Sequence, residues 1–299
     1  GDGLLETAAQ GGATAFAGTA LGRLISLGLQ IMVSRSFGPE YFGLYATGII
    51  ICQILRVLSS LGLQKGGMRY LAIAVERRDA PALPGIINTA TYLPFAGGVV
   101  IAVIGFFLAP FLAAVCFNRP DMVNVLRHFV IAVPFLSLLQ ISADLSRAFK
   151  TTKYAAMIED VFFAVLQIAL FLAFRAAGFG FESVLYSFVS SAIVASLVML
   201  SLARMQASRL YRASHTPAAK QRGPLFPANW MEIVAYSLPL MPLGLLFVAN
   251  NFMDIIMLNI LGSAAGVGEY AAAARWIIMF VLIMQPLNLI FGPMIASQF

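Results

Sequence analysis

Three arginines inside long apolar stretches are the residues of this sequence best suited to chemistry. Arg23 and Arg56 lie near the middle of two successive apolar runs, and Arg275 lies in the last one. An arginine at the centre of a spanning helix costs about 2.5–3.5 kcal/mol on insertion scales, so it normally faces a polar interior. The guanidinium is a planar fork of donors that matches phosphate oxygens and keeps its charge. These arginines therefore predict a site for a diphosphate or another anion.

Polar side chains accompany the arginines at helical spacing. Gln30 lies on the stripe of Arg23, and Gln53 lies one turn before Arg56, so we expect both glutamines in the substrate site. On a later run Asn250 and Asp254 are one turn apart. We expect Asn250 in the same site. Asp254 is either a group that couples transport to an ion or one half of a structural ion pair with Arg275.

Small residues offer a packing surface beside the first of these stripes. Gly18 and Gly22 lie four residues apart on a strip next to Arg23. Such a pair lets the backbone of a second helix approach closely within a membrane. We therefore expect another helix to pack there.

The other acidic residues lie mostly near predicted helix ends. Asp144 with Arg147, and Glu159 next to Asp160, are expected to be surface charges, with contacts between lobes as the alternative. Asp254 is then the only clear acidic residue within a span. An exporter of cations that is driven by protons or sodium would be expected to carry buried carboxylates along its pathway. The sequence therefore favours an anionic substrate.

Catalytic motifs are absent from the chain. It has two histidines, His128 and His215, and no HExxH, paired CxxC, Walker or dinucleotide-binding pattern. We expect no enzymatic activity, no catalytic residues, no metal and no cofactor. The two cysteines, Cys52 and Cys116, are expected to be core residues, because free cysteine is usually buried.

The composition predicts the elements that position these residues. Of 299 residues, 60% are hydrophobic and 11% are charged, whereas soluble domains are roughly 45–50% apolar and about 25% charged. The sequence predicts an all-α, polytopic transmembrane bundle. Runs long enough to span a membrane lie near residues 12–33, 41–63, 83–108, 125–145, 155–174, 184–203, 233–258 and 267–290.

Basic residues indicate the orientation of the chain. Twelve of the 19 Lys and Arg residues lie in connections after the second, fourth and sixth runs, and four lie in the other connections. The positive-inside rule then places the N-terminus in the cytoplasm. Because the charge lies in loops and not on one face, we expect contact with membrane lipids and none with nucleic acid. The longest connection divides the chain into 1–204, a basic cytoplasmic linker at 205–230, and 231–299.

Two joints between runs carry a family resemblance. The first reads FGPEYFGLY at 37–45, and LGSAAGVGEY at 261–270 echoes it; LGL at 61–63, RYLA at 69–72 and YSLPL at 236–240 accompany them. These segments resemble the polysaccharide repeat-unit flippases of bacteria, of the O-antigen type. Those proteins belong with the multidrug and toxin extrusion exporters and the lipid-linked peptidoglycan precursor flippases.

The resemblance implies two six-helix lobes around a central cavity with alternating access. The family has about twelve or more helices, so we expect 1–204 to be a complete first lobe and 231–299 the first two helices of a truncated second lobe. By the same resemblance, Arg23, Arg56 and Arg275 would hold the diphosphate of a polyprenyl-linked oligosaccharide while the polyprenyl tail stays in lipid.

We therefore expect a secondary transporter of lipid-linked oligosaccharide in the bacterial inner membrane. It would serve lipopolysaccharide or related polysaccharide synthesis, with the polysaccharide polymerase machinery as a further partner. One alternative is a cation-coupled multidrug exporter of the same fold that depends on Asp254. A second is a membrane-embedded sugar transferase or ligase, which would need acidic or histidine residues in outer loops that are short and poor in both.

Overall fold

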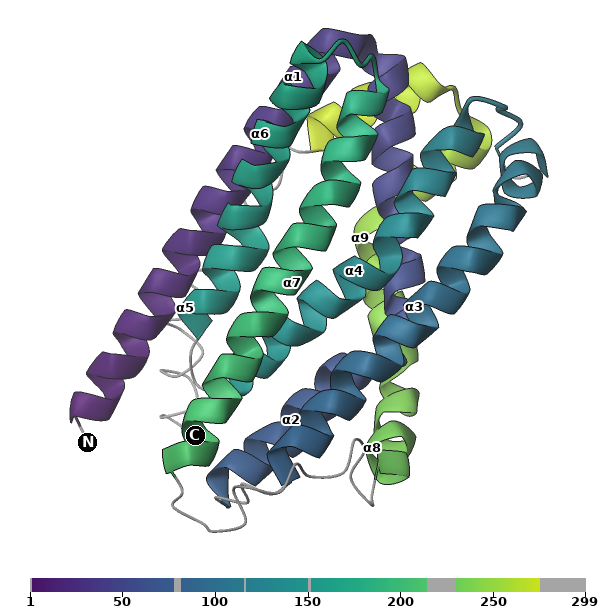
Figure 1. The fold of residues 1–299 in the computed structure, drawn as a ribbon. Coiled ribbons are helices and arrows are strands. Elements are labelled where there is room, and N and C mark those ends of the chain that lie inside the picture. The colour runs from purple at the N-terminus through teal and green to yellow at the C-terminus, as the bar shows by residue number, and fades with distance from the viewer. Residues whose placement is uncertain (1, 78–81, 116, 150–151, 214–229, 275–299) are drawn as a thin grey trace, which may run out of the picture.

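The protein is a bundle of long helices that run back and forth between two ends (Figure 1). The computed structural model describes residues 2–77, 82–115, 117–149, 152–213 and 230–274. The elements within them are α1 (Asp2–Ser60), α2 (Leu63–Glu76), α3 (Ala82–Val115), α4 (Met122–Ala148), α5 (Thr152–Ala155), η1 (Ala156–Phe162), α6 (Phe163–Ala176), α7 (Glu182–Ala213), α8 (Trp230–Ser237), η3 (Leu238–Leu240) and α9 (Met241–Leu261). No strand occurs in these ranges, which confirms the all-α prediction.

The element α1 is a hairpin of two spanning helices. Its 59 residues would make a straight helix of about 88 Å, far longer than the hydrocarbon core of about 30 Å. The chain reverses at Gly38, whose φ of 81° and ψ of 174° are not helical and suit only glycine. Pro39 follows and fixes the first φ of the second arm. The two arms, 2–37 and 39–60, correspond to the first two predicted runs.

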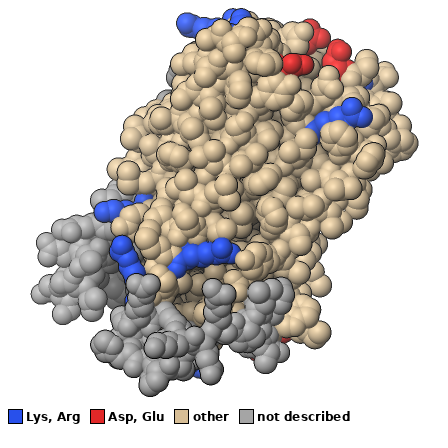
Figure 2. All heavy atoms as spheres, viewed as in Figure 1, with Lys and Arg blue, Asp and Glu red and all other residues tan. Residues whose placement is uncertain are grey.

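The apolar helices confirm a multi-pass membrane protein. Six helices within the described ranges are long and apolar enough to cross a membrane, and the first of them contains both arms of α1. Figure 2 shows an uncharged belt across the middle of one face, with charged residues toward the ends of the molecule. The last predicted run, 267–290, begins in a helical stretch at 264–274 and then lies outside the described residues.

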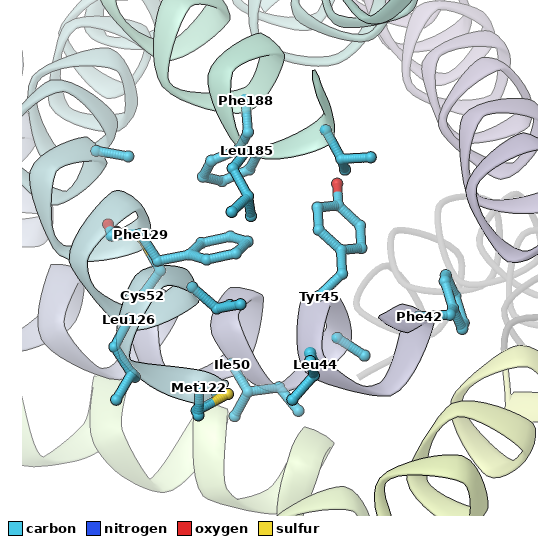
Figure 3. Close-up of a cluster of buried hydrophobic side chains, with 14 of the residues drawn as sticks. Phe42, Leu44, Tyr45, Ile50, Cys52, Met122, Leu126, Phe129, Leu185 and Phe188 are labelled. Carbon is cyan, nitrogen blue, oxygen red and sulfur yellow. Dashed lines mark hydrogen bonds between the residues drawn. The ribbon is translucent and has the colours of Figure 1, made fainter. Parts of the chain in front are cut away.

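The core forms where α4 packs against α1, α3 and α7. The ring of Phe129 lies 5.8 Å from that of Tyr45 and 4.7 Å from that of Phe188, measured between centroids. Figure 3 shows these side chains of α1, α4 and α7 gathered in one cluster. Cys52 is buried among them, and its Sγ donates to the carbonyl of Phe129. The prediction of a core cysteine is confirmed for Cys52, while Cys116 lies outside the described residues.

The pair Gly18 and Gly22 packs against η1, a π-helical turn at the start of the fifth predicted run. A Cβ at Gly18 would lie 3.3 Å from the Cβ of Ala156, and one at Gly22 would lie 2.5 Å from the carbonyl carbon of Asp160. The expected close helix contact is therefore confirmed. It brings the Arg23 stripe against a turn that carries two acidic residues.

The segment from α8 to α9 is a broken helix that contacts the bundle near both of its ends. A 3₁₀ turn, η3, separates the two helices; Pro239 is its central residue, and Pro242 lies in the first turn of α9. At one end of the bundle α8 packs on α2, and at the other α9 and residues 264–268 pack on the Gly38 turn of α1. We call these the α2 end and the Gly38 end.

The helix α7 is longer than predicted. It continues to Ala213, so the segment predicted as a linker from residue 205 begins as helix. Residues 214–229 of that segment lie outside the described residues.

Candidate functional site

A cavity of about 830 Å³ lies between the second arm of α1, the first turn of α2, the helix α4 and the segment η3–α9. Its polar lining consists of Gln53, Arg56, Ser60, Gln64, Lys65, Gln140, Asp144, Arg147 and Asn251. Side chains of α9, among them Leu243 and Phe247, supply much of the apolar lining. A concave site with mostly apolar walls and a few convergent polar groups is typical of a ligand-binding cavity.

Arg56 is held in this cavity by two neutral amides. Its Nε donates to Oε1 of Gln53 over 2.9 Å, and its Nη1 donates to Oε1 of Gln140 over 2.6 Å. Among the described residues no carboxylate lies within ion-pair distance of Arg56. The amides therefore orient the guanidinium without neutralising it. A half-buried cation in this state favours an anionic ligand.

Arg147, next to the same cavity, is neutralised by two carboxylates. Its Nη1 lies 2.6 Å from Oδ1 of Asp144, and its Nη2 lies 2.7 Å from Oε2 of Glu159. The three side chains are only 17–28% exposed, so the prediction of surface charge for these residues is wrong. The physical reason is that η1 packs on α4 and brings Glu159 to Arg147, twelve residues earlier in the chain.

A second cavity, of about 210 Å³, lies on the other side of Arg56. Gln53, Arg56 and Gln140 line both cavities, whereas Glu159 and Asp160 line the smaller one. The hydroxyl of Thr19 donates to Oδ2 of Asp160 over 2.8 Å. The expectation that Asp254 is the only clear acidic residue within a span is therefore wrong, because Glu159 and Asp160 belong to an apolar spanning helix.

The predicted site residues do not all come together. Gln53 and Arg56 line the large cavity, but Arg23 is not part of its lining. Arg23 is half-buried beside η1, where its charge attracts Asp160, and it makes no hydrogen bond or ion pair with the described residues. Gln30 lies in a separate cavity of about 150 Å³ toward the Gly38 end, with Arg35. Its Oε1 is buried without a hydrogen-bond partner in the described part of the chain.

The remaining predicted residues lie on or beyond α9. Asn250 is exposed, and its neighbour Asn251 lines the large cavity instead. Asp254 is also exposed and accepts a hydrogen bond from the Tyr270 hydroxyl over 2.5 Å. Arg275 lies outside the described residues, so its place in the substrate site and its pairing with Asp254 stay predictions.

Several polar residues of the cavity are absent from the sequence prediction, among them Gln64, Lys65 and Gln140. The signal for Gln140 was present, because Ser137, Gln140 and Asp144 form a polar stripe on one face of α4. Gln64 and Lys65 were assigned to a connection after the second run. No local sequence pattern distinguishes a lysine in a solvated loop from a lysine whose side chain lines a cavity.

At the Gly38 end, direct contacts join α9 and the residues after it to α1 and to the connection between α3 and α4. Thr47 Oγ1 donates to Oδ1 of Asn259 over 2.7 Å, and Nη2 of Arg119 donates to the carbonyl of Gly262 over 3.0 Å. Gly43 and Gly268 face the backbone of the opposite segment, where a Cβ would have no room. These contacts join the two joints that carry the sequence echo.

A second set of contacts joins α2 to α8 at the opposite end. The Tyr70 hydroxyl donates to Glu232 over 3.2 Å, and the guanidinium of Arg69 lies 4.3 Å from the ring centroid of Tyr236. Reduced solvation raises the pKa of Tyr70, and its hydrogen bond to Glu232 raises it further. The large cavity thus lies between contacts at the α2 end and contacts at the Gly38 end.

Comparison with known proteins identifies a family for the chain. A family model described as polysaccharide biosynthesis protein matches residues 8–298. Neither the curated proteins nor the solved structures contain a match. With nearly the whole chain matched, the protein belongs to the polysaccharide biosynthesis protein family.

Proposed function

We propose that the protein is a flippase that moves polyprenyl-diphosphate-linked oligosaccharide across the bacterial inner membrane. Membership of the polysaccharide biosynthesis protein family supports the substrate class. The observation that carries the proposal is Arg56, a cation that two amides orient into an 830 Å³ cavity and that has no carboxylate partner among the described residues. A diphosphate would supply the missing negative charge through bidentate hydrogen bonds.

The two sets of contacts around the cavity suit alternating access. In this proposal the α2 end faces the cytoplasm, as the positive-inside rule predicts. Separation of Tyr70 from Glu232 would open the cavity to that side, and separation of Thr47 from Asn259 would open it to the other. A substrate or a coupling ion must bind the two states with different affinity to bias their populations. The turn η3, which contains Pro239, is the element of α8–α9 best placed to bend.

A cation-coupled exporter is the second candidate, and one observation favours it. Glu159 and Asp160 line the smaller cavity, which supplies the carboxylates that such a transporter needs. Glu159 is, however, bound to Arg147, and the cation Arg56 faces both carboxylates across the same cavity. The positive charge of Arg56 disfavours a second cation in this cavity. If transport of organic cations depends on Glu159 while Arg56→Ala has no effect, the exporter is the correct function.

Surface polysaccharide provides the first test of the flippase. Arg56→Ala and Arg56→Lys are introduced into the full-length protein, with Arg209→Ala as the matched control, because Arg209 is exposed and does not line the cavity. We expect Arg56→Ala to abolish export and Arg56→Lys to retain part of it, since lysine keeps the charge but loses the planar fork. Normal export by Arg56→Ala at unchanged expression would refute the proposal.

A further inference from the structure

We infer that the first turn of α2, with Gln64 and Lys65, is a second phosphate subsite that holds one phosphate of a prenyl diphosphate while Arg56 holds the other. This inference rests on the proposed function and names residues that the sequence analysis did not assign to the site. It starts from an unpartnered donor, an uncapped helix end and a surplus of positive charge, all in the same cavity.

The unpartnered donor is the side-chain amide of Gln64. Gln64 lines the large cavity, and its Nε2 is buried without a hydrogen-bond partner among the described residues. An amide nitrogen only donates, so an acceptor is needed to satisfy it. A buried polar group without a partner calls for an explanation, such as a ligand or a bound water. A phosphate oxygen in the cavity would provide the acceptor.

The helix end beside Gln64 also favours an anion. The N-cap of α2 is Gly62, with a φ of 73° and no side-chain cap. The amides of Lys65 and Gly66 donate to the carbonyl of Gly62, and no side chain covers the amides before them. Gly62, Gln64 and Lys65 all line the cavity, so this N-terminus faces it. Uncapped amides and the helix dipole attract anions at such a position.

Gly62 is required for this geometry. A Cβ at Gly62 would collide with the backbone of Ser237, and one at Gly66 would collide with the Ser237 side chain. The close approach of α8 therefore fixes the start of α2 at the edge of the cavity. Packing of α2 against Ser237 of α8 therefore holds the subsite in place.

The charge of the lining matches a diphosphate. Arg56, Lys65 and Arg147 line the cavity with a single carboxylate, that of Asp144, and Glu159 neutralises Arg147 from the adjacent cavity. Arg56 and Lys65 remain as the two cations without an ion-pair partner in the described residues. A sugar-linked diphosphate carries a negative charge on each phosphate. Each phosphate thus has one cation available to it, and the three cations together exceed the two carboxylates of Asp144 and Glu159 by one positive charge.

Binding of short prenyl phosphates to the full-length protein tests the subsite. Farnesyl diphosphate, farnesyl phosphate and inorganic pyrophosphate are titrated against wild type, Lys65→Ala, Gln64→Glu, Arg56→Ala and the control Lys153→Ala. Lys153 is exposed and lies outside the cavity lining. Gln64→Glu keeps the shape of the side chain but replaces the donor with a charge that repels phosphate. Thermal unfolding of each variant shows that it is folded.

We expect Lys65→Ala and Gln64→Glu to weaken farnesyl diphosphate binding by about tenfold or more and farnesyl phosphate binding by less than about twofold, with Lys153→Ala unchanged. Wild type should bind farnesyl diphosphate more tightly than pyrophosphate. If Arg56→Ala weakens binding but the two α2 variants behave like the control, the subsite is wrong and the proposed function stands. If pyrophosphate binds as tightly as farnesyl diphosphate, the assignment to a lipid-linked ligand is overturned.

Discussion

Replacement of Arg147 by alanine should destabilise the protein more than any other loss of a single positive charge in the described residues. Arg147 pairs with Asp144 over 2.6 Å and with Glu159 over 2.7 Å, and the two carboxylate side chains are 17% and 19% exposed. Removing one partner of a buried pair costs about 3–5 kcal/mol. Because these groups keep some exposure, we expect a loss of about 2–3 kcal/mol in the free energy of unfolding.

A double-mutant cycle separates this effect from lost packing. Glu159→Gln alone removes one ion pair, whereas Arg147→Ala with Glu159→Gln also removes one of the two carboxylates that Arg147→Ala leaves unpaired. We expect the double variant to be more stable than Arg147→Ala, with a coupling of at least about 1 kcal/mol. Chemical unfolding in detergent gives the stabilities, and Arg209→Ala, at an exposed position, should stay within about 0.5 kcal/mol of wild type. An Arg147→Ala variant as stable as Arg209→Ala would refute the interior ion cluster.

Three further substitutions test the packing around the site. Gly22→Ala should destabilise by about 1–3 kcal/mol, because its Cβ would meet the backbone of Asp160. Gly28→Ala, with nothing within 4 Å of its Cβ, should be neutral or stabilising. Equal thermal unfolding midpoints for Gly22→Ala and Gly28→Ala would contradict the contact between Gly22 and η1. Gly38→Ala should destabilise the protein by about 1–3 kcal/mol, because the φ of Gly38 is 81°. The control is Gly180→Ala, whose Cβ would meet nothing within 4 Å. Equal thermal unfolding midpoints for the two variants would contradict the prediction. Tyr70→Phe should raise the reactivity of a cysteine placed at Met68, in the cavity lining, toward a charged thiol reagent added from the α2 side; unchanged reactivity would mean that Tyr70 does not hold the α2 end closed.

Local sequence patterns were sufficient for the long apolar helices and for one close contact between them, whereas α2 lies in a predicted connection. Apolar runs long enough to span a bilayer are recognised from their composition. Gly38 and Pro39 mark the reversal of the chain, because only glycine suits the backbone angles at residue 38. Gly18 and Gly22 marked a close helix contact because small residues at this spacing have few other uses in a membrane. The partner in that contact, η1, could not be predicted, because no residue pattern is specific for a π-helical turn.

The candidate site was only partly predictable because it depends on which helix faces which neighbour. Arg23 and Arg56 lie on similar polar stripes, yet the first packs beside η1 and the second lines the large cavity. Position along the helix suggested surface charge for Asp144 and Glu159, but tertiary packing joined them through Arg147. The sequence places Lys65 in a connection, but the packing of α8 on α2 fixes the start of α2 at the cavity.

Flipping by the purified full-length protein tests the central claim most directly. The protein is reconstituted into vesicles that contain a fluorescent prenyl-diphosphate-linked sugar, and a membrane-impermeant quencher reports the rate at which the lipid changes leaflet. Wild type and Arg209→Ala should flip the lipid at the same rate, and Arg56→Gln should reduce that rate by about tenfold or more, as expected for loss of a charged hydrogen-bond partner of the phosphate. Equal flipping rates for Arg56→Gln and wild type would contradict the account.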